Sequence, residues 1–546
     1  MITLPLLRAV IPALALSLVA STPVFCQPSA PTSVDQNCER LAQLKLPAAN
    51  ITVAKLVPAG RFSGPPALYT GMDLSSFYKT LPSFCRVVAQ ATPSSDSDIK
   101  LEVWMPAASW NGKLQGIGNG GFAGQIDYAQ LGTAVSHGYA AVATDTGHTG
   151  APIDAAWALG HPEKVIDFGH RAVHEMTRIA KGTINAFYGR TPQRSYFWGC
   201  SDGGREALME AQRYPEDYDG ILAGAPANYW TALLSTGVFD TQALTVDPAS
   251  FIPPAKIPAL ANAVLAACDS LDGVRDGILN DPRQCHFDPA SMRCKNGEDT
   301  DVCLTAPQVA AVKKLYQGPQ DSQGRTVFPG FLPGAEDGPG GWGVWITGPA
   351  PNKSLLAFFG TGYFSNMVYD KSDWDYRTFT LDSGLKAASE KTASVLNANN
   401  PDLSSFQARG GKLILYHGWD DPGISALNSI NYYENVVKTL GKHKASGFVR
   451  LYMVPGMQHC HGGPGADDFG ADGYDPSDPS LNLRLALEDW VETNKAPGSI
   501  RAAKYSPGDS HHRPTMTRPL CAYPSFAKYK GSGDTNDAAN FVCAEK

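Results

Sequence analysis

Residues 195–213 read SYFWGCSDGGREALMEAQR, and this stretch decides the fold. A short apolar segment predicts a strand, a G-x-S-x-G turn follows it, and the residues after the turn have helical character. In this strand–turn–helix context the serine sits on a sharp, strained turn, and small residues around it keep strand and helix from clashing. The motif alone also fits a plain glycine turn. The flanking strand and helix favour the elbow and make Ser201 the candidate nucleophile.

The same alternation of strand and helix extends to both sides of this turn. The sequence predicts helices over 165–186 and 430–440 and further strands over 99–105, 113–117, 139–144, 412–416 and 448–454. Strands alternating with helices indicate an α/β fold with a mostly parallel sheet covered on both faces. The alternation lapses between 229 and 404, where Cys, Asp, Gly, Pro and aromatic residues gather. We therefore expect a catalytic domain in two parts, 27–228 and 405–546, interrupted by a lid domain over 229–404.

A serine nucleophile needs a base to take its proton and an acid to orient that base. After such an elbow the acid and then the base are expected in the loops that follow later strands. Residues 417–422 read HGWDDP and residues 455–461 read PGMQHCH, each directly after a predicted strand. Taken singly, such an aspartate is often a turn residue and such a histidine is often only solvated. Their order and context indicate a catalytic set with Ser201.

Eleven cysteines indicate an oxidising compartment. Ten cysteines remain when Cys26 is removed with the signal peptide. Short spacings suggest three local pairs, Cys268–Cys285, Cys294–Cys303 and Cys521–Cys543. The other four cysteines are Cys38, Cys85, Cys200 and Cys460. No C-x-x-C occurs, which disfavours a zinc cluster. Cys200 precedes Ser201 and Cys460 follows His459. If both catalytic residues share one site, their neighbours must lie close, and a bridge selects His459 over His461. A bridge between Cys200 and Cys460 would close a loop of about 260 residues, which implies at most roughly 5–6 kcal/mol of chain-entropy stabilisation.

The N-terminus and the overall charge limit the cell compartment and the partners. Arg8 is followed by about twelve apolar or small residues, which suit a secretory signal peptide over 1–26 better than a membrane span. We therefore expect a secreted or periplasmic protein, with a lipoprotein site at Cys26 as a less favoured alternative. No later run reaches 18 apolar residues, so no membrane association is expected after signal removal. The 546 residues carry 52 acidic and 45 basic side chains, net charge -7, which argues against a nucleic-acid partner.

The Cys-Ser, distal Asp and His-Cys motifs resemble the tannase and feruloyl esterase family, which includes mono(hydroxyethyl) terephthalate hydrolases. The resemblance covers most of the chain after residue 26 and implies an α/β-hydrolase fold with a large inserted lid domain. In the family's acid loop the second acidic position bears the catalytic carboxylate, which implies Asp421; Asp420 stands where the family often has a small residue. Residues 110–112 with 118–121 resemble the oxyanion loop, and residues 518–524 resemble the family's tail. The oxyanion would be held by backbone N–H groups of Asp202 and of Gly120 or Gly121.

The lid carries an acidic loop, CDSLDGVRDGI over 268–278, which is not an EF-hand. Taken alone it reads as a solvated acidic turn, but the resemblance implies a structural calcium. The implied ligands are three carboxylates and two main-chain oxygens, from Asp269, Asp272, Asp276, Val274 and Ile278, with Cys268–Cys285 clamping the loop.

The resemblance also implies the reaction. The expected function is that of a serine esterase acting on esters of hydroxycinnamic acids, of plant cell-wall origin, by an acyl-enzyme on Ser201; galloyl esters and a terephthalate monoester are alternatives. Eight aromatic residues between Phe358 and Phe379 offer stacking partners for an aromatic acyl group, although most are expected in the lid core, and Arg377 is a candidate anchor. The rival classes are a non-catalytic aromatic-ligand binding protein and a metallohydrolase using His459 and His461.

Overall fold

The computed structural model describes residues 1–4, 9, 34–471, 480–506 and 513–545, so the predicted signal peptide lies almost entirely outside the described residues, Cys26 included. A nine-stranded sheet forms the centre, in the order β1-β2-β3-β5-β4-β6-β7-β8-β9. Neighbouring strands pair in parallel from β5 through β4, β6, β7 and β8 to β9. At one side of the sheet, β1, β2 and β3 pair antiparallel. The strands are β1 (Ala49–Val57), β2 (Phe84–Ala91), β3 (Ile99–Pro106), β4 (Lys113–Ile117), β5 (Ala140–Thr144), β6 (Arg194–Cys200), β7 (Gly220–Gly224), β8 (Lys412–Gly418) and β9 (Val449–Val454).

Helices cover both faces of the sheet because its strand residues alternate between two cores. Phe197 packs with one core and its neighbours Tyr196 and Trp198 with the other, as the period of two in a strand requires. Helices α5, α6 and α14 contribute to the first core and α3 and α16 to the second. The catalytic-domain helices are α1 (Val34–Glu39), α2 (Ser75–Tyr78), α3 (Tyr128–Ser136), α4 (Pro162–Ile166), α5 (Ala172–Tyr188), α6 (Asp202–Arg213), α14 (Leu427–Leu440), α15 (Lys442–Ser446) and α16 (Leu483–Thr493).

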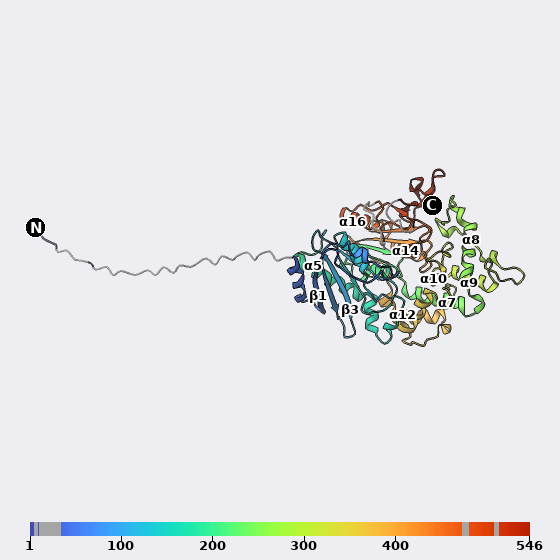
Figure 1. Cartoon of the computed structure of the whole chain (residues 1–546), viewed down its shortest axis with the longest axis horizontal. Coiled ribbons are helices and arrows are strands. Elements are labelled where there is room, and N and C mark those ends of the chain that lie inside the picture. Colours follow the sequence, from blue (N-terminus) through green and yellow to red (C-terminus); the bar gives the residue numbers. More distant parts are fainter. Residues whose placement is uncertain (5–8, 10–33, 472–479, 507–512, 546) are drawn as a thin grey trace.

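The segment between β7 and β8 is the insertion, and it contains helices but no strand of the central sheet. Figure 1 shows its helices α8, α9 and α10 gathered at the end of the molecule away from β1 and α5. Its aromatic residues Tyr363, Phe364 and Phe379 belong to a hydrophobic core that also includes Phe122 and Phe168 of the catalytic domain. The helices are α7 (Trp230–Thr245), α8 (Ile257–Cys268), α9 (Ala306–Gln317), α10 (Trp342–Trp345), α11 (Leu355–Tyr363), α12 (Leu381–Leu396) and α13 (Ser404–Ala408).

The sequence predicted several central strands well but missed β7, which pairs with the elbow strand β6, and strands at the margins. The predicted strand over 113–117 coincides with β4, and the one over 412–416 is β8 without its last two residues. The helix predicted over 165–186 is interrupted by a π-helical turn over Asp167–Arg171. Strands β1, β2 and β7 and the C-terminal pairs β10 (Ser499–Lys504) with β11 (Met516–Cys521) and β12 (Phe526–Tyr529) with β13 (Phe541–Ala544) were not predicted.

Within the described part of the chain, one helical stretch, Pro248–Asp272, is long and apolar enough by composition to cross a membrane. It comprises several short pieces interrupted near Pro253 and Pro254, and its longest helix, α8, has 12 residues. The inner face of α8 is buried among lid residues, with Leu260 and Val264 fully covered. The buried apolar face of α8 therefore packs within the lid, although only 39% of the apolar window of this stretch is buried.

Candidate active site

The turn after β6 holds Ser201 in a conformation that few residues adopt. Ser201 has φ 64° and ψ −119°, and its N–H donates to Gly224 O at 3.0 Å. A Cβ on Gly199 would come within 2.5 Å of the Gly203 backbone, and a Cβ on Gly203 within 2.8 Å of Asn119 O. Glycine is therefore required on both sides of the serine, and α6 begins directly after it.

Ser201, His459 and Asp421 form one hydrogen-bonded line. Ser201 Oγ lies 2.9 Å from His459 Nε2, and His459 Nδ1 lies 2.8 Å from Asp421 Oδ2. The three side chains come from the ends of β6, β8 and β9, which lie at the same edge of the sheet because these strands run parallel. The exposed His461 makes no such contact through its side chain. The histidine side chain is thus positioned to take the serine proton while the carboxylate orients its ring.

The Asp421 carboxylate is buried and surrounded by donors. Its Oδ1 accepts from the N–H groups of Gly423 and Ile424 at 2.8 and 2.9 Å, and its Oδ2 also faces His417 Nε2 at 3.1 Å. Burial alone raises the pKa of Asp421, but the charge of His459 and the hydrogen bonds from His417 and His459 outweigh it, so the pKa lies well below its usual value. Asp421 is therefore ionised throughout the physiological range.

The structure separates Asp421 from its neighbour Asp420. The Asp420 side chain is buried, and its Oδ1 has no hydrogen-bond partner within the part of the chain that the structure describes. Burial and then the negative charge of the lid residue Glu336 raise the pKa of Asp420 well above its usual value. Burial likewise raises the pKa of Glu336 to about 7. Asp420 therefore faces the lid rather than His459.

A disulfide links the two segments that carry the serine and the histidine. Cys200 and Cys460 are bonded, with their Cα atoms 6.0 Å apart. Cys460 adopts φ 64°, a left-handed conformation uncommon outside glycine. The other bridges are Cys38–Cys85, Cys268–Cys285, Cys294–Cys303 and Cys521–Cys543. All ten cysteines between residues 34 and 545 are paired.

The loop after β4 lies against the elbow, where an oxyanion would form. Neither the Asp202 N–H nor the Gly120 and Gly121 N–H groups donate to a protein acceptor among the described residues. The Asp202 side chain turns inward to Arg205 at 2.5 Å, which leaves its backbone N–H as the available donor. The buried Glu206 carboxyl accepts from Asn119 N–H at 2.8 Å and holds the loop in place. Burial, followed by the charge of Asp202, raises the pKa of Glu206.

Two lid aromatics approach the histidine. The Trp345 ring of α10 packs edge-on against His459 with ring centroids 4.6 Å apart, and it stacks with Phe359 of α11 at 6.2 Å. Both rings are only half-buried. The sequence analysis included Phe359 but missed Trp345, which lies 13 residues before the aromatic run. Of that run, Tyr363, Phe364 and Phe379 are buried in the lid core, and Arg377 is exposed and paired with Asp375.

The acidic loop of the lid partly fits a hard cation. Asp272, Val274, Asp276 and Ile278, four of the five implied ligands, line one small cavity of about 10 Å³. Burial and the charge of Asp276 raise the pKa of Asp272 against a hydrogen bond from Val274 N–H. Arg518 lines the same cavity and donates to Asp276 at 2.7 Å, so its positive charge already balances one of the carboxylates. The third carboxylate, of Asp269, instead accepts from Gly277 N–H at 3.1 Å. No group of three His, Cys, Asp or Glu side chains in metal-binding arrangement occurs among the described residues.

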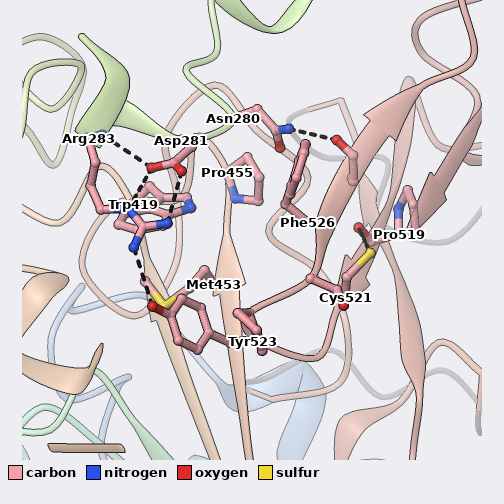
Figure 2. Close-up of a pocket in the computed structure, with 13 residues that line it drawn as sticks. Asn280, Asp281, Arg283, Trp419, Met453, Pro455, Pro519, Cys521, Tyr523 and Phe526 are labelled. Atoms are coloured by element: carbon pink, nitrogen blue, oxygen red, sulfur yellow. Dashed lines mark hydrogen bonds and ion pairs between the residues drawn. The ribbon is translucent and has the colours of Figure 1, made fainter. Parts of the chain in front are cut away.

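The segment after this loop fastens the lid to the catalytic domain. Arg283 pairs with Asp281 at 2.7 Å and lies over the rings of Trp419 and Tyr523, 5.1 and 5.7 Å from their centroids. Figure 2 shows this joint, with Arg283 directed at both Asp281 and the Tyr523 hydroxyl. Trp419 belongs to the loop that carries Asp421. The position of the lid is therefore coupled to the acid loop.

A sheet in this order, with a serine in a strand–helix elbow and an aspartate and a histidine after two later strands, defines an α/β-hydrolase. The family model described as tannase and feruloyl esterase matches residues 85–544. The chain belongs to this family, and it is a carboxylic ester hydrolase.

Individual relatives agree with this assignment. The chain is 40% identical to an uncharacterized esterase of Xanthomonas campestris pv. campestris, over 94% of this chain and 92% of that one. It is 34% identical to the mono(2-hydroxyethyl) terephthalate hydrolase of Piscinibacter sakaiensis, over 85% of each chain. The crystal structure of feruloyl esterase B from Aspergillus oryzae superposes with a TM-score of 0.85 at 29% identity, covering 94% of this chain and all of that one.

Proposed function

We propose that this enzyme hydrolyses esters of hydroxycinnamic acids, with feruloyl esters first, through an acyl-enzyme on Ser201. The observation that carries the proposal is the line from Ser201 Oγ through His459 to Asp421, with contacts of 2.9 and 2.8 Å. Ser201 attacks the ester carbonyl while His459 takes its proton and returns it to the leaving alcohol. Water then cleaves the acyl-enzyme by the same proton transfers in reverse.

Backbone groups would stabilise the tetrahedral oxyanion. The Asp202 N–H at the start of α6 is one proposed donor, and the N–H of Gly120 or Gly121 is the other. Their lack of competing acceptors among the described residues supports this role. The Trp345 and Phe359 rings support the aromatic part of the proposal, because they offer a half-exposed π surface next to His459.

Calcium is proposed as a structural ion. Asp269, Asp272 and Asp276 would hold it by carboxylate and Val274 and Ile278 by main-chain oxygen, and Asp276 would share its charge between the ion and Arg518. The proposed compartment is extracellular or periplasmic, supported by five disulfides.

The test is a comparison of initial rates on methyl ferulate, methyl gallate and mono(2-hydroxyethyl) terephthalate, with Ser201→Ala measured alongside. Mono(2-hydroxyethyl) terephthalate is included because the relative from Piscinibacter sakaiensis is named as a hydrolase of this ester. We expect methyl ferulate to give the highest kcat/KM, and the variant to lose about 10⁴- to 10⁶-fold in kcat. A serine-directed phosphonate should add one adduct at Ser201. Full activity of the variant, or turnover of none of the three esters, would refute the proposal.

A further inference from the structure

A cavity of about 430 Å³ lies at the junction of lid and catalytic domain, and none of the catalytic residues lines it. Its volume is within the range of small-molecule sites. Its wall comes from three parts of the chain: the segment after β7, the lid residues around 326–329 with Asn399, and α14. The lining residues are Asn228, Tyr229, Thr326, Val327, Phe328, Pro329, Asn399, Asn428, Asn431, Tyr432, Glu434 and Asn435.

Asparagine side chains form a stripe along the cavity side of α14. Asn428, Asn431 and Asn435 follow one another at intervals of three and four residues, which places them on one helix face. Asn431 and Asn435 are exposed, and neither makes a side-chain hydrogen bond within the described part of the chain. Asparagine is a weak helix former, so helix stability does not explain this stripe.

Two further amides of the wall are buried and only half satisfied. Asn228 and Asn428 are 1% and 6% exposed. Asn428 Nδ2 donates to Asn228 Oδ1 at 2.7 Å and to Pro226 O at 3.0 Å. These bonds leave Asn228 Nδ2 as a donor and Asn428 Oδ1 as an acceptor without a protein partner among the described residues. Both atoms retain some contact with solvent, so they are available to a ligand or to water in the cavity.

The chemistry of the wall defines the ligand class. It contains no Lys or Arg, and its one acid, Glu434, accepts a hydrogen bond from the Tyr523 hydroxyl at 2.8 Å. Amides present a donor and an acceptor side by side, as the vicinal hydroxyls of a sugar do. Tyr229, Phe328 and Tyr432 also line the wall, but Phe328 and Tyr432 are only 2% and 4% exposed. The half-buried ring of Tyr229 is therefore the aromatic surface that remains accessible to the C–H side of a sugar ring. We propose that this cavity binds a neutral saccharide.

One backbone hydrogen bond connects the cavity wall to the residue that carries the nucleophile. Ala227 N–H donates to Ser201 O at 3.0 Å, and the next residue, Asn228, lines the cavity. A sugar bound here would give an ester carried on a glycan a second anchor, a consequence that rests on the proposed function. Saccharide binding itself does not depend on ester hydrolysis.

The test is a calorimetric titration of the intact enzyme with neutral xylo- and arabino-oligosaccharides, and with a galacturonate oligomer. The Asn431→Ala/Asn435→Ala double variant removes two exposed amides, and Asn185→Ala, an exposed amide on α5, is the matched control. We expect the neutral sugars to bind, the double variant to bind about tenfold more weakly, and the control to bind as the wild type does. The kcat on methyl ferulate should be equal in all three proteins.

Three results would overturn the proposal: no binding at about 10 mM neutral saccharide, equal affinity in the double variant, or equally tight binding of the galacturonate oligomer. A separate measurement compares KM for a feruloylated arabino-oligosaccharide with KM for methyl ferulate in wild type and double variant. Loss of binding with unchanged KM would separate the saccharide site from ester recognition. Failure to hydrolyse either ester would leave the titration interpretable.

Discussion

His417 Nε2 lies 3.1 Å from Oδ2 of Asp421, the same carboxylate oxygen that faces His459 at 2.8 Å. The same nitrogen lies 3.0 Å from Ile424 O, so it carries the proton and donates, while Nδ1 accepts from the Ser429 hydroxyl at 2.7 Å. The ring is fully buried. His417 is therefore a positioning residue that fixes the Asp421 carboxylate from within the protein.

Replacing His417 with Phe should lower kcat about 10- to 100-fold with little change in KM. The loss of a donor weakens the stabilisation of ionised Asp421 and should raise its pKa. Because a lowered folded-state pKa stabilises the fold above the unfolded value of about 3.9, the variant should lose stability at pH 6 but much less near pH 3. The measurements are kcat/KM against pH and the melting temperature at both pH values. His417→Gln, which keeps a donor, should recover part of kcat; a KM effect alone would contradict the positioning role.

Removing the disulfide between Cys200 and Cys460 should cost both stability and activity. The chain-entropy model gives at most about 5–6 kcal/mol for this 260-residue separation, against about 2–3 kcal/mol for the nine-residue separation of Cys294–Cys303. We expect the Cys200→Ser/Cys460→Ser variant to lose kcat as well, because nothing then holds the strained Cys460 backbone next to His459. The Cys294→Ser/Cys303→Ser variant is the control and should keep kcat. Equal kcat losses in both variants would show that the effect is general destabilisation.

Stability should fall as the pH rises above neutral, because of the Asp420 and Glu336 carboxyls. Both have folded-state pKa values raised above the unfolded values, Glu336 to about 7, so their protonated forms favour the fold. The stabilisation is complete below the unfolded pKa of about 4 and is lost as the pH rises through the folded values. Asp420→Asn should therefore raise the melting temperature at pH 8.5 relative to wild type and flatten its pH dependence. Asp373→Asn, at an exposed site, should change neither the melting temperature at pH 8.5 nor its pH dependence. A wild-type melting temperature that rises above pH 7 would disprove this explanation.

Calcium should raise the melting temperature without entering the chemistry. We expect a chelator to lower it and added calcium to restore it in a concentration-dependent manner, as for any ligand that binds only the folded state. The measurement is calorimetry with metal analysis of the purified enzyme. Asp272→Asn should abolish the response, and Asp301→Asn, at an exposed lid residue, should preserve it. Metal-free protein whose melting temperature ignores calcium would eliminate the site.

Trp345→Ala should raise KM for aromatic acid esters about tenfold and leave aliphatic methyl esters little affected. The physical reason is the loss of a half-exposed ring 4.6 Å from that of His459. The comparison uses methyl ferulate and methyl butyrate. Tyr369→Ala, in the aromatic cluster with Phe364 and Trp374, is the control. Equal KM changes for the two esters would place Trp345 outside acyl recognition.

The sequence analysis succeeded where local signals coincide with chain order. The G-x-S-x-G turn, the two motif loops after strands and the cysteines beside Ser201 and His459 led to side chains that the structure brings together. Trp345 was missed because its place beside His459 depends on how the lid packs, and no local pattern distinguishes it from other lid aromatics. His417 was read as part of a motif, but its contact with Asp421 depends on the turn at Gly423 and Ile424. Strand β7 was missed because GILAG, buried on both faces, is too short to show a period.

The insertion between β7 and β8 also fixes when the enzyme can become active. Ser201 and His459 are 258 residues apart, which at ordinary rates of translation corresponds to roughly 10 to 50 s. During that interval the nascent chain already carries the serine elbow but has no base to deprotonate it. Strands β8 and β9, which carry Asp421 and His459, join the sheet only after the lid has been made. A chain truncated before residue 459 lacks the proposed base, so we expect it to cleave esters far more slowly than the full-length chain.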